Sequence, residues 1–378
     1  MKIIIAPDSF KGSLSALEVA RAIQKGIKNA DTTIETVVVP MADGGEGTVQ
    51  SLVDATDGRI IELNVHDPLF RKIKSFYGIM GDGKTAVIEM AAASGLPLLK
   101  PEERNPLKTT SYGTGELIKD AVDRGCNEVI LGLGGSATND GGIGMAKALG
   151  IRFLDAHRNE VGSCGGDLVN IETVDVSGID DRLAHVKFVA ACDVDNPLCG
   201  KNGAANVYGR QKGATEDDVT FLDNGLAHFA DIIEGKQGID LKDHPGAGAA
   251  GGLGFGVMVF LHGRLESGIA IVSRMAKLAD KMVGADLVIT GEGQIDFQTA
   301  HGKTPFGVAQ LAKAKHIPVV AVAGSLGDNY QMLYQKGFDA IFSIIDKPMA
   351  IEDAFDNTSE LLQNISESIV RLWTSVKK

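Results

Sequence analysis

Five short apolar runs, of the kind that fill parallel β-strands, lie at the two ends of the chain and not in its middle. The first two are at residues 2–6 and 36–39, and the others are at 287–290, 319–323 and 340–345. Near-continuous runs of Ile, Val and Leu are typical of strands that helices cover on both faces. Apolar residues at helical spacing follow most of these runs, so the ends of the chain predict a doubly wound parallel sheet.

The middle of the chain has a different pattern. Three runs between residues 59 and 90, joined by turn signals, predict an antiparallel meander, and further helices and strands follow it. We therefore expect an α/β protein in which residues 1–59 plus 273–378 form a flavodoxin-like domain with five strands. Residues 60–272 would form a large inserted domain of mixed α/β type. One continuous sheet is the alternative, but it would be unusually wide.

Charge and hydropathy exclude several classes of partner. Lys and Arg number 37 against 49 Asp and Glu, a net charge of −12, which argues against nucleic acid because phosphate backbones are bound by clustered cations. The uncharged stretch 246–261 is too short and too glycine-rich to span a membrane. The four cysteines include no C-x-x-C pair, as expected of a reduced cytoplasmic protein. The oligomeric state stays open, with a homodimer as one option.

Glycine is the one residue type in clear excess, with 47 of 378 residues against an average near 7%. Three loops that follow predicted strands combine glycine with carboxylates: 8–12, 43–47 and 291–296. Asp and Gly are also ordinary turn residues, so any one of these loops is equally well explained as structural. Ligands of an open α/β sheet bind at the carboxyl ends of its strands, so three such loops together favour a site there.

Two lysines beside predicted helix starts suggest anion binding. Lys11 precedes the helix that begins after Ser15, where free N–H groups and the helix dipole favour a carboxylate or phosphate. Lys303 precedes a second helix start, with Thr304 as the expected cap, and contact with a phosphate is one reading of it. The segment is not a Walker A loop, because Phe297 stands where that motif requires glycine.

A glycine-dense segment in the middle of the chain, 132–137, follows a predicted strand and leads toward a helix at 143–149. It fits a relaxed dinucleotide-binding pattern, with Asp155 at the expected distance. The insertion 139–142 interrupts the helix start on which a pyrophosphate would lie. A loop that binds nucleotide phosphates through its backbone N–H groups is the alternative. A second segment, 246–256, must approach either a ligand or a neighbouring helix closely.

Asp193 and Asp195 follow another strand at positions i and i+2. Carboxylates there suit Mg²⁺, which takes one or two of them together with substrate phosphates, or the acceptance of a hydroxyl proton. An Asx-turn before Pro197 is the structural explanation. Taken together, lysines, backbone N–H groups and carboxylates favour phosphoryl transfer over other reactions.

Five motifs carry a resemblance to the bacterial glycerate kinase family of type 1 that extends over essentially the whole chain. They are Ala6–Ser13, Ala42–Thr48, Gly132–Gly142, Pro245–Gly252 and Thr290–Asp296. The resemblance implies ATP-dependent phosphorylation of D-glycerate with Mg²⁺, and it favours the 2-hydroxyl. It also implies two α/β domains. Gln294 departs from the family, which often has a basic residue there. If that basic residue contacts the substrate, this chain must use another donor, for which Lys303 is a candidate.

Individual roles are assigned from the chemistry of the residues. Asp193 is the first choice for the catalytic base or a metal ligand, and Asp8 and Asp43 are further catalytic candidates. Glycerate would contact Ser9, Lys11 and Glu46, and Mg²⁺ would be bound by Glu292 and Asp296. The nucleotide phosphates would be bound by Gly134, Gly135, Ser136, Thr138 and Lys303. The alternatives are an NAD-dependent dehydrogenase of a small hydroxy acid, using residues 132–137, and a non-catalytic anion-binding protein.

Overall fold

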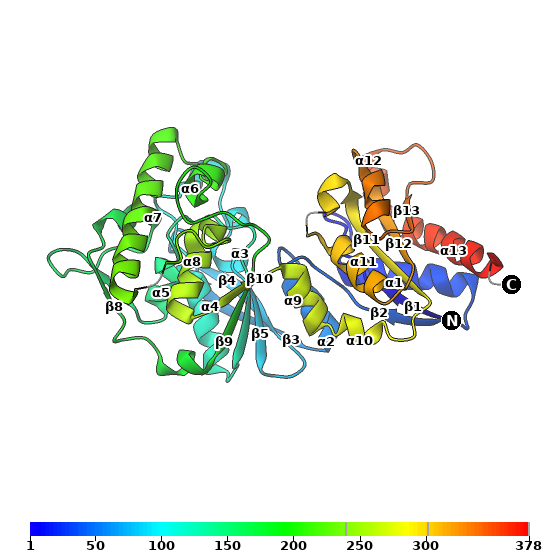
Figure 1. Ribbon diagram of the computed structural model, residues 1–378, viewed down its shortest axis with the longest axis horizontal. Coiled ribbons are helices and arrows are strands. Elements are labelled where there is room, and N and C mark those ends of the chain that lie inside the picture. Colours follow the sequence, from blue (N-terminus) through cyan, green and yellow to red (C-terminus); the bar gives the residue numbers. More distant parts are fainter. Residues whose placement is uncertain (239, 301, 377–378) are drawn as a thin grey trace. The chain divides into compact units, whose positions relative to one another are not determined.

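The computed structural model describes residues 1–238, 240–300 and 302–376, and its helices and strands are labelled in Figure 1. The chain divides into two compact units. Unit 1 consists of Met1–Asp43, Gln50–Thr56 and Ile269–Lys378, and unit 2 consists of Gly44–Val49 and Asp57–Gly268. The chain therefore passes between the units four times. Within the described ranges, no helix combines the length and apolar character that crossing a bilayer would require.

The sheet of unit 1 has five strands, all parallel, in the spatial order β13-β12-β11-β1-β2. Numbered within this sheet, the order is 2-1-3-4-5, the flavodoxin-like arrangement. The predicted doubly wound parallel sheet is therefore confirmed. Its strands are β1 (Lys2–Ile5), β2 (Glu35–Val38), β11 (Leu287–Ile295), β12 (Val319–Leu326) and β13 (Ala340–Ser343).

Helix α1 begins where the sequence indicates, because Ser15 and Glu18 form a reciprocal capping box. It lies beside the terminal helix α13, and the approach is close, since a Cβ on Gly26 would lie 2.2 Å from the carbonyl oxygen of Gln363 (Figure 1). The helices of this part of the chain are α1 (Ala16–Ala30), α2 (Thr48–Thr56), α9 (Gly268–Met275), α10 (Leu278–Lys281), α11 (Thr304–Ala314), α12 (Ile351–Asp356) and α13 (Thr358–Val376), with 3-10 turns η6 (Phe297–Ala300) and η7 (Tyr330–Lys336).

Three local predictions in unit 1 were wrong. The pattern at 329–335 predicts a helix, but this segment is the 3-10 turn η7. The pattern around 352–373 predicts one terminal helix, but the chain forms two, and the first ends at Asp356. Thr304 does not cap α11, whose cap position is Lys303. The hydroxyl of Thr304 donates to Asp8 instead, so a long-range partner replaces the local one.

The sheet of unit 2 has six strands in the order β10-β9-β6-β5-β4-β3. Strands β3, β4 and β5 pair antiparallel, as the predicted meander requires, while β5, β6, β9 and β10 pair parallel. The strand that the apolar pattern predicts at 151–154 is β7, which pairs with β8 in a separate two-stranded sheet. The strands are β3 (Arg59–His66), β4 (Lys72–Ile79), β5 (Thr85–Glu89), β6 (Glu128–Gly132), β7 (Arg152–Leu154), β8 (Thr173–Asp175), β9 (Lys187–Ala191) and β10 (Arg264–Glu266).

Helix α8 explains the second glycine-dense segment. Residues 250–252 all have positive φ, and a Cβ on Gly251 would lie 1.9 Å from the carbonyl oxygen of Thr138. The glycines therefore let α8 pack against the neighbouring loop. The helices of unit 2 are α3 (Ala91–Ser94), α4 (Tyr112–Asp123), α5 (Ile143–Ala148), α6 (Ala204–Tyr208), α7 (Glu216–Gln237) and α8 (Ala249–Leu261), with 3-10 turns η1 (Leu96–Leu98), η2 (Pro101–Glu103), η3 (Gly165–Asn170), η4 (Asp181–His185) and η5 (Arg210–Lys212).

Candidate functional site

A carboxylate cluster lies in unit 1, where the adjacent strands β1 and β11 carry acidic residues. Asp8 follows β1, and its backbone N–H donates to the carbonyl of Gly291 in β11 at 2.8 Å. One oxygen of its carboxylate accepts a bond from the hydroxyl of Thr304 at 2.5 Å, and the other accepts the N–H of Ser9 at 2.6 Å. Glu292 is the next residue of β11 after Gly291. Parallel pairing of these strands thus brings Asp8 together with a residue almost 300 positions later.

Burial raises the pKa of two of these acids. The pKa of Asp8 is raised to about 6, mainly because its carboxylate loses contact with water, with a further contribution from the nearby charge of Asp43. For Glu292, which is 9% exposed, the same cause raises the pKa to about 7, and the charges of Asp8 and Asp296 add to it. Both groups therefore change protonation within the physiological range, which is typical of catalytic acids and bases.

Lys303 is the cation of this cluster. Its ammonium lies 3.8 Å from Oε2 of Glu292 and 3.9 Å from Oδ1 of Asp296. The other oxygen of Glu292 accepts a bond from the hydroxyl of Thr299 at 2.7 Å. Both predicted metal ligands, Glu292 and Asp296, thus lie close to the ammonium of Lys303, which is the predicted phosphate contact.

The donor set fits Mg²⁺ better than a structural metal. No group of three or more His, Cys, Asp or Glu side chains in the described ranges is arranged to hold a metal ion. Mg²⁺ is commonly bound by one or two protein carboxylates, with waters and substrate phosphates as its other ligands. Glu292 and Asp296 could supply those two carboxylates, since an oxygen of each faces the same point, beside the ammonium of Lys303.

The loop after β1 gives less support to an anion site at the start of α1. Lys11 is exposed, and its charge lowers the pKa of Asp8 only as a minor contribution. The carboxylate of Glu18 accepts the N–H and the hydroxyl of Ser15, and Ser15 in turn accepts the N–H of Glu18. The helix start is thus already bonded to a carboxylate of its own, and Lys11 is the group left to bind an external anion.

The 43–47 loop is divided between the two units. Asp43 belongs to unit 1, where its charge acts on Asp8, whereas Glu46 belongs to unit 2. In unit 2 the segment 44–49 packs on the ends of the parallel strands, with a Cβ on Gly44 only 2.6 Å from that of Ala191. Glu89, at the end of β5, accepts the N–H of Val49 at 2.8 Å. Its pKa is raised by burial, with a smaller contribution from Glu46.

The glycine-rich loop after β6 leads into α5, and the start of this helix is already bonded to a carboxylate of the protein. Asp140, fully buried, accepts the N–H groups of Gly142 and Gly144 in the first turn of α5. It also accepts both the N–H and the hydroxyl of Ser111 at 2.7 Å. A carboxylate of the protein therefore occupies the place that a dinucleotide phosphate would take, which argues against the dehydrogenase interpretation. Gly134 and Gly135, earlier in the loop, are exposed.

Lys212 was missed by the sequence reasoning. It lies in η5, and its ammonium donates to the hydroxyl oxygen of Ser136 at 2.8 Å and to the carbonyl of Thr138 at 2.7 Å. Burial lowers its pKa to about 7. No spacing pattern in the sequence marks this lysine. The nearest signal is Gly213, the next residue, whose φ of +95° fixes the backbone there.

Asp193, the first catalytic choice from the sequence, lies at the end of β9 in unit 2. Its side chain is exposed, and Oδ1 accepts the N–H of Gly268 at 3.0 Å. Asp195 is exposed as well. The structure brings Asp193 to the same sheet edge as Glu89 and the glycine-rich loop, since β5, β6 and β9 run parallel.

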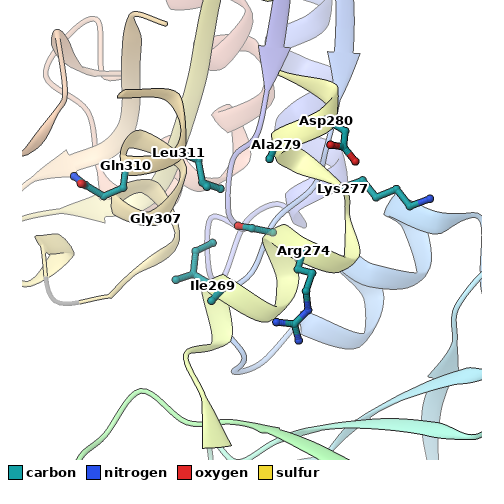
Figure 2. A pocket seen from close by; sticks show the side chains of 10 residues that line it. Ile269, Arg274, Lys277, Ala279, Asp280, Gly307, Gln310 and Leu311 are labelled. Atoms are coloured by element: carbon teal, nitrogen blue, oxygen red, sulfur yellow. The ribbon is translucent and has the colours of Figure 1, made fainter. Parts of the chain in front are cut away.

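A separate cavity of about 520 Å³ lies in unit 1 between α9, α10 and α11. Its lining is mostly apolar and includes none of the residues that the sequence singled out. Figure 2 shows Ile269 and Leu311, which extend into the space between α9 and α11. Arg274 extends from α9, and Lys277 extends from the short segment between α9 and α10.

The similarity to known proteins identifies the chain as an α/β phosphotransferase. The chain belongs to the glycerate kinase family, whose model matches residues 3–374. It is 54% identical over 369 residues to the glycerate kinase of Bacillus subtilis (strain 168), covering 98% of this chain and 97% of that relative. It is 50% identical over 373 residues to the glycerate 2-kinase of Escherichia coli (strain K12), covering 98% of each. A crystal structure of a candidate glycerate kinase 2 from Salmonella typhimurium LT2 superposes with a TM-score of 0.92 at 47% identity, covering 100% of this chain and 99% of the other.

Proposed function

We propose that this protein is a glycerate kinase that transfers the γ-phosphoryl group of ATP to a hydroxyl of D-glycerate. The observation that carries this proposal is the similarity to bacterial enzymes of that name over nearly the full length of both chains. The chemistry of the site supports it, because phosphoryl transfer needs a proton acceptor, cations for the phosphates and carboxylates for Mg²⁺.

In unit 1, Asp8 is our candidate for the group that accepts the hydroxyl proton. Its pKa, raised to about 6, leaves it ionised at neutral pH yet basic enough to receive a proton in the transition state. The bond from Thr304 holds one oxygen, and so orients the carboxylate. Lys11 and Ser9 are the candidates for the glycerate carboxylate and hydroxyls, since both lie in the loop that follows Asp8.

Mg²⁺ would be bound by Glu292 and Asp296, and it would supply charge neutralisation for the transferring phosphoryl group. Lys303 already lies between these carboxylates, and its ammonium is a second cation for the phosphates. In unit 2, the exposed glycines 134 and 135 with Ser136 and Thr138 are the candidates for binding the nucleotide phosphates. Glu46, Asp43 and Asp193 are carboxylates whose roles in substrate binding or proton transfer also remain predictions, as do a cytoplasmic location and a homodimer.

The 2-hydroxyl is the acceptor that we favour, because one relative at 50% identity is named a glycerate 2-kinase. Phosphorus NMR of the product from D-glycerate and MgATP tests both the activity and the position. The expected signal is that of authentic 2-phosphoglycerate. A 3-phosphoglycerate signal would correct the position, and no phosphoglycerate would contradict the proposed activity. L-glycerate is the matched control for substrate handedness.

A further inference from the structure

Lys212 is the one buried lysine among the residues that the structure describes, at 2% exposure. The glycine that follows it fixes its backbone, because a Cβ at Gly213 would lie 2.2 Å from the carbonyl oxygen of Arg104. Lysine side chains are almost never fully buried without a partner of opposite charge. This one therefore requires an explanation.

The partners of Lys212 are two neutral oxygens of the glycine-rich loop. Its ammonium bonds to the side chain of Ser136 and to the backbone carbonyl of Thr138, so that it fixes the loop at two points on either side of Ala137. Since Oγ of Ser136 accepts this bond, its own O–H is left to donate to another group. The loop is thus held from its buried side while Gly134 and Gly135 remain exposed on the other.

The ammonium lacks a full counter-charge. No carboxylate in the described ranges forms an ion pair with it, and Asp140 is the one charged group with an appreciable effect on its pKa. Burial raises the pKa of Asp140 as well, while the bonds that it accepts from Ser111, Gly142 and Gly144 act in the opposite direction. Arg104 lies across from Gly213, and Arg210 is paired with Glu216 at the exposed side of η5. Burial of an uncompensated cation is costly, so an anion beside it would stabilise the charged form.

We propose that Lys212 is a positioning residue that holds the Ser136–Thr138 segment in the conformation that binds the nucleotide phosphates and that takes up a proton from solvent when they bind. This inference rests on the proposed function, since it requires a nucleotide. The proton goes to Nζ of Lys212, which becomes fully charged when the phosphate binds to the loop. Lys212 acts through Ser136 and the loop and not by contact with the reacting atoms.

Calorimetric titration of the wild-type protein with MgADP, in buffers of different ionisation enthalpy, measures this proton most clearly at pH 8, where Glu292 has already lost the proton that Mg²⁺ would displace. With the pKa of the free lysine at about 7, the expected uptake by Lys212 is about 0.1 proton at pH 6 and about 0.9 at pH 8. Binding of MgADP without uptake at pH 8 would overturn the proposal and leave the proposed function standing. No binding of MgADP at all would instead contradict the proposed function.

Variants separate positioning from a general structural role. Lys212→Met should raise the Kd for MgADP and the KM for ATP by roughly 10–100-fold, the effect of losing charged hydrogen bonds, and leave the KM for glycerate within about twofold. Lys212→Arg keeps the charge but cannot lose its proton, so it should bind MgADP without the pH-dependent uptake. Lys84→Met, at an exposed lysine before the start of β5 in the same unit, is the control and should match the wild type.

Circular dichroism of each variant shows whether it folds, and the wild-type proton measurement decides the question if Lys212→Met does not. An equal rise in both KM values, with unchanged proton uptake in Lys212→Arg, would show that Lys212 supports the fold and has no specific effect on the nucleotide. That result would overturn the proposal.

Discussion

Burial moves ionisable groups of opposite sign toward their neutral forms in the two units. In unit 1 it raises the pKa of Asp8 to about 6 and that of Glu292 to about 7, and in unit 2 it lowers the pKa of Lys212 to about 7. Unit 1 holds more carboxylates than cations in its cluster, whereas Lys212 has no carboxylate bonded to it. The difference indicates complementary needs: the first cluster is stabilised by an added cation, and the second by an added anion.

The largest expected effect on activity comes from removal of Asp8, the candidate base in unit 1. Asp8→Asn keeps the shape and one acceptor oxygen, which can serve either Thr304 or Ser9, but cannot accept a proton. We expect kcat to fall by about 10²–10⁴-fold, the usual contribution of general base catalysis, with little change in the KM for ATP. Steady-state kinetics on both substrates measure it.

Two matched variants show whether the loss of kcat is specific to Asp8. Asp356→Asn, at an exposed aspartate of α12 in the same unit, should leave kcat unchanged. Asp193→Asn tests the competing candidate in unit 2. If Asp8→Asn turned over at the wild-type rate while Asp193→Asn lost activity, the base would have to be assigned to unit 2.

Removal of one acid from the proposed metal pair should give the next largest effect. Glu292→Gln keeps an acceptor for Thr299 but loses the charge that attracts Mg²⁺. We expect the Mg²⁺ concentration for half-maximal rate to rise by roughly 10–100-fold, as for loss of a charged contact. A Mg²⁺ titration of the rate tests this, and a recovery of kcat at high Mg²⁺ is part of the expectation. An unchanged Mg²⁺ dependence would exclude Glu292 as a ligand.

The pH dependence of Mg²⁺ binding follows from the same residue. A carboxylate must lose its proton to bind a metal, and the pKa of Glu292 is about 7. Mg²⁺ affinity should therefore be constant above about pH 8 and fall by about tenfold per pH unit below pH 7. Isothermal titration with Mg²⁺ in the presence of ADP, at a series of pH values, measures the slope. In Glu292→Gln the slope attributed to this group should disappear, and its persistence would point to another acid.

The smallest expected effect is on stability. The folded-state pKa of Glu292 is raised above the unfolded value of 4.5, so its contribution to stability is fully present below pH 4.5 and is lost as the pH rises through about 7. Glu292→Gln should therefore stabilise the fold at pH 8, by up to about 3 kcal/mol, and by less at pH 5. Thermal unfolding at both pH values tests this. Glu35→Gln, at an exposed glutamate of β2, should shift the free energy of unfolding by no more than about 0.5 kcal/mol at either pH.

Local sequence signals predicted the elements of the fold well where the local interaction also decides the structure. The capping box of Ser15 and Glu18 starts α1 as expected, and the apolar runs became strands within a few residues of their predicted limits. Thr304 is the contrary example. Its position before Pro305 is typical of a cap, yet its hydroxyl is bonded to Asp8, a partner that no local pattern specifies.

The sequence indicated which residue types form the candidate site, but only partly which of those residues lie together in the structure. Asp8 follows β1, and parallel pairing of β1 with β11 brings it together with Glu292 as expected. The predicted loop at 291–296 was wrong, however, because β11 continues to Ile295 and Glu292 lies within the strand. Asp43 and Glu46 were predicted as one loop, but they belong to different units. Which unit a loop residue joins depends on how its backbone packs, and Gly44 packs against Ala191, nearly 150 residues away.

The sequence by itself determined the strands, the order in which carboxylates and glycines follow them, and the family, because these depend on periodicity and on residue identity at fixed spacing. Only the tertiary structure decided which of the acids and lysines are buried. Asp8, Glu292 and Lys212 owe their shifted pKa values to loss of water, and burial is a property of what packs around a group and not of its neighbours in the chain. That is why Lys11 was easy to single out from the sequence but remains exposed, while Lys212, which no motif marks, is the lysine that holds the glycine-rich loop.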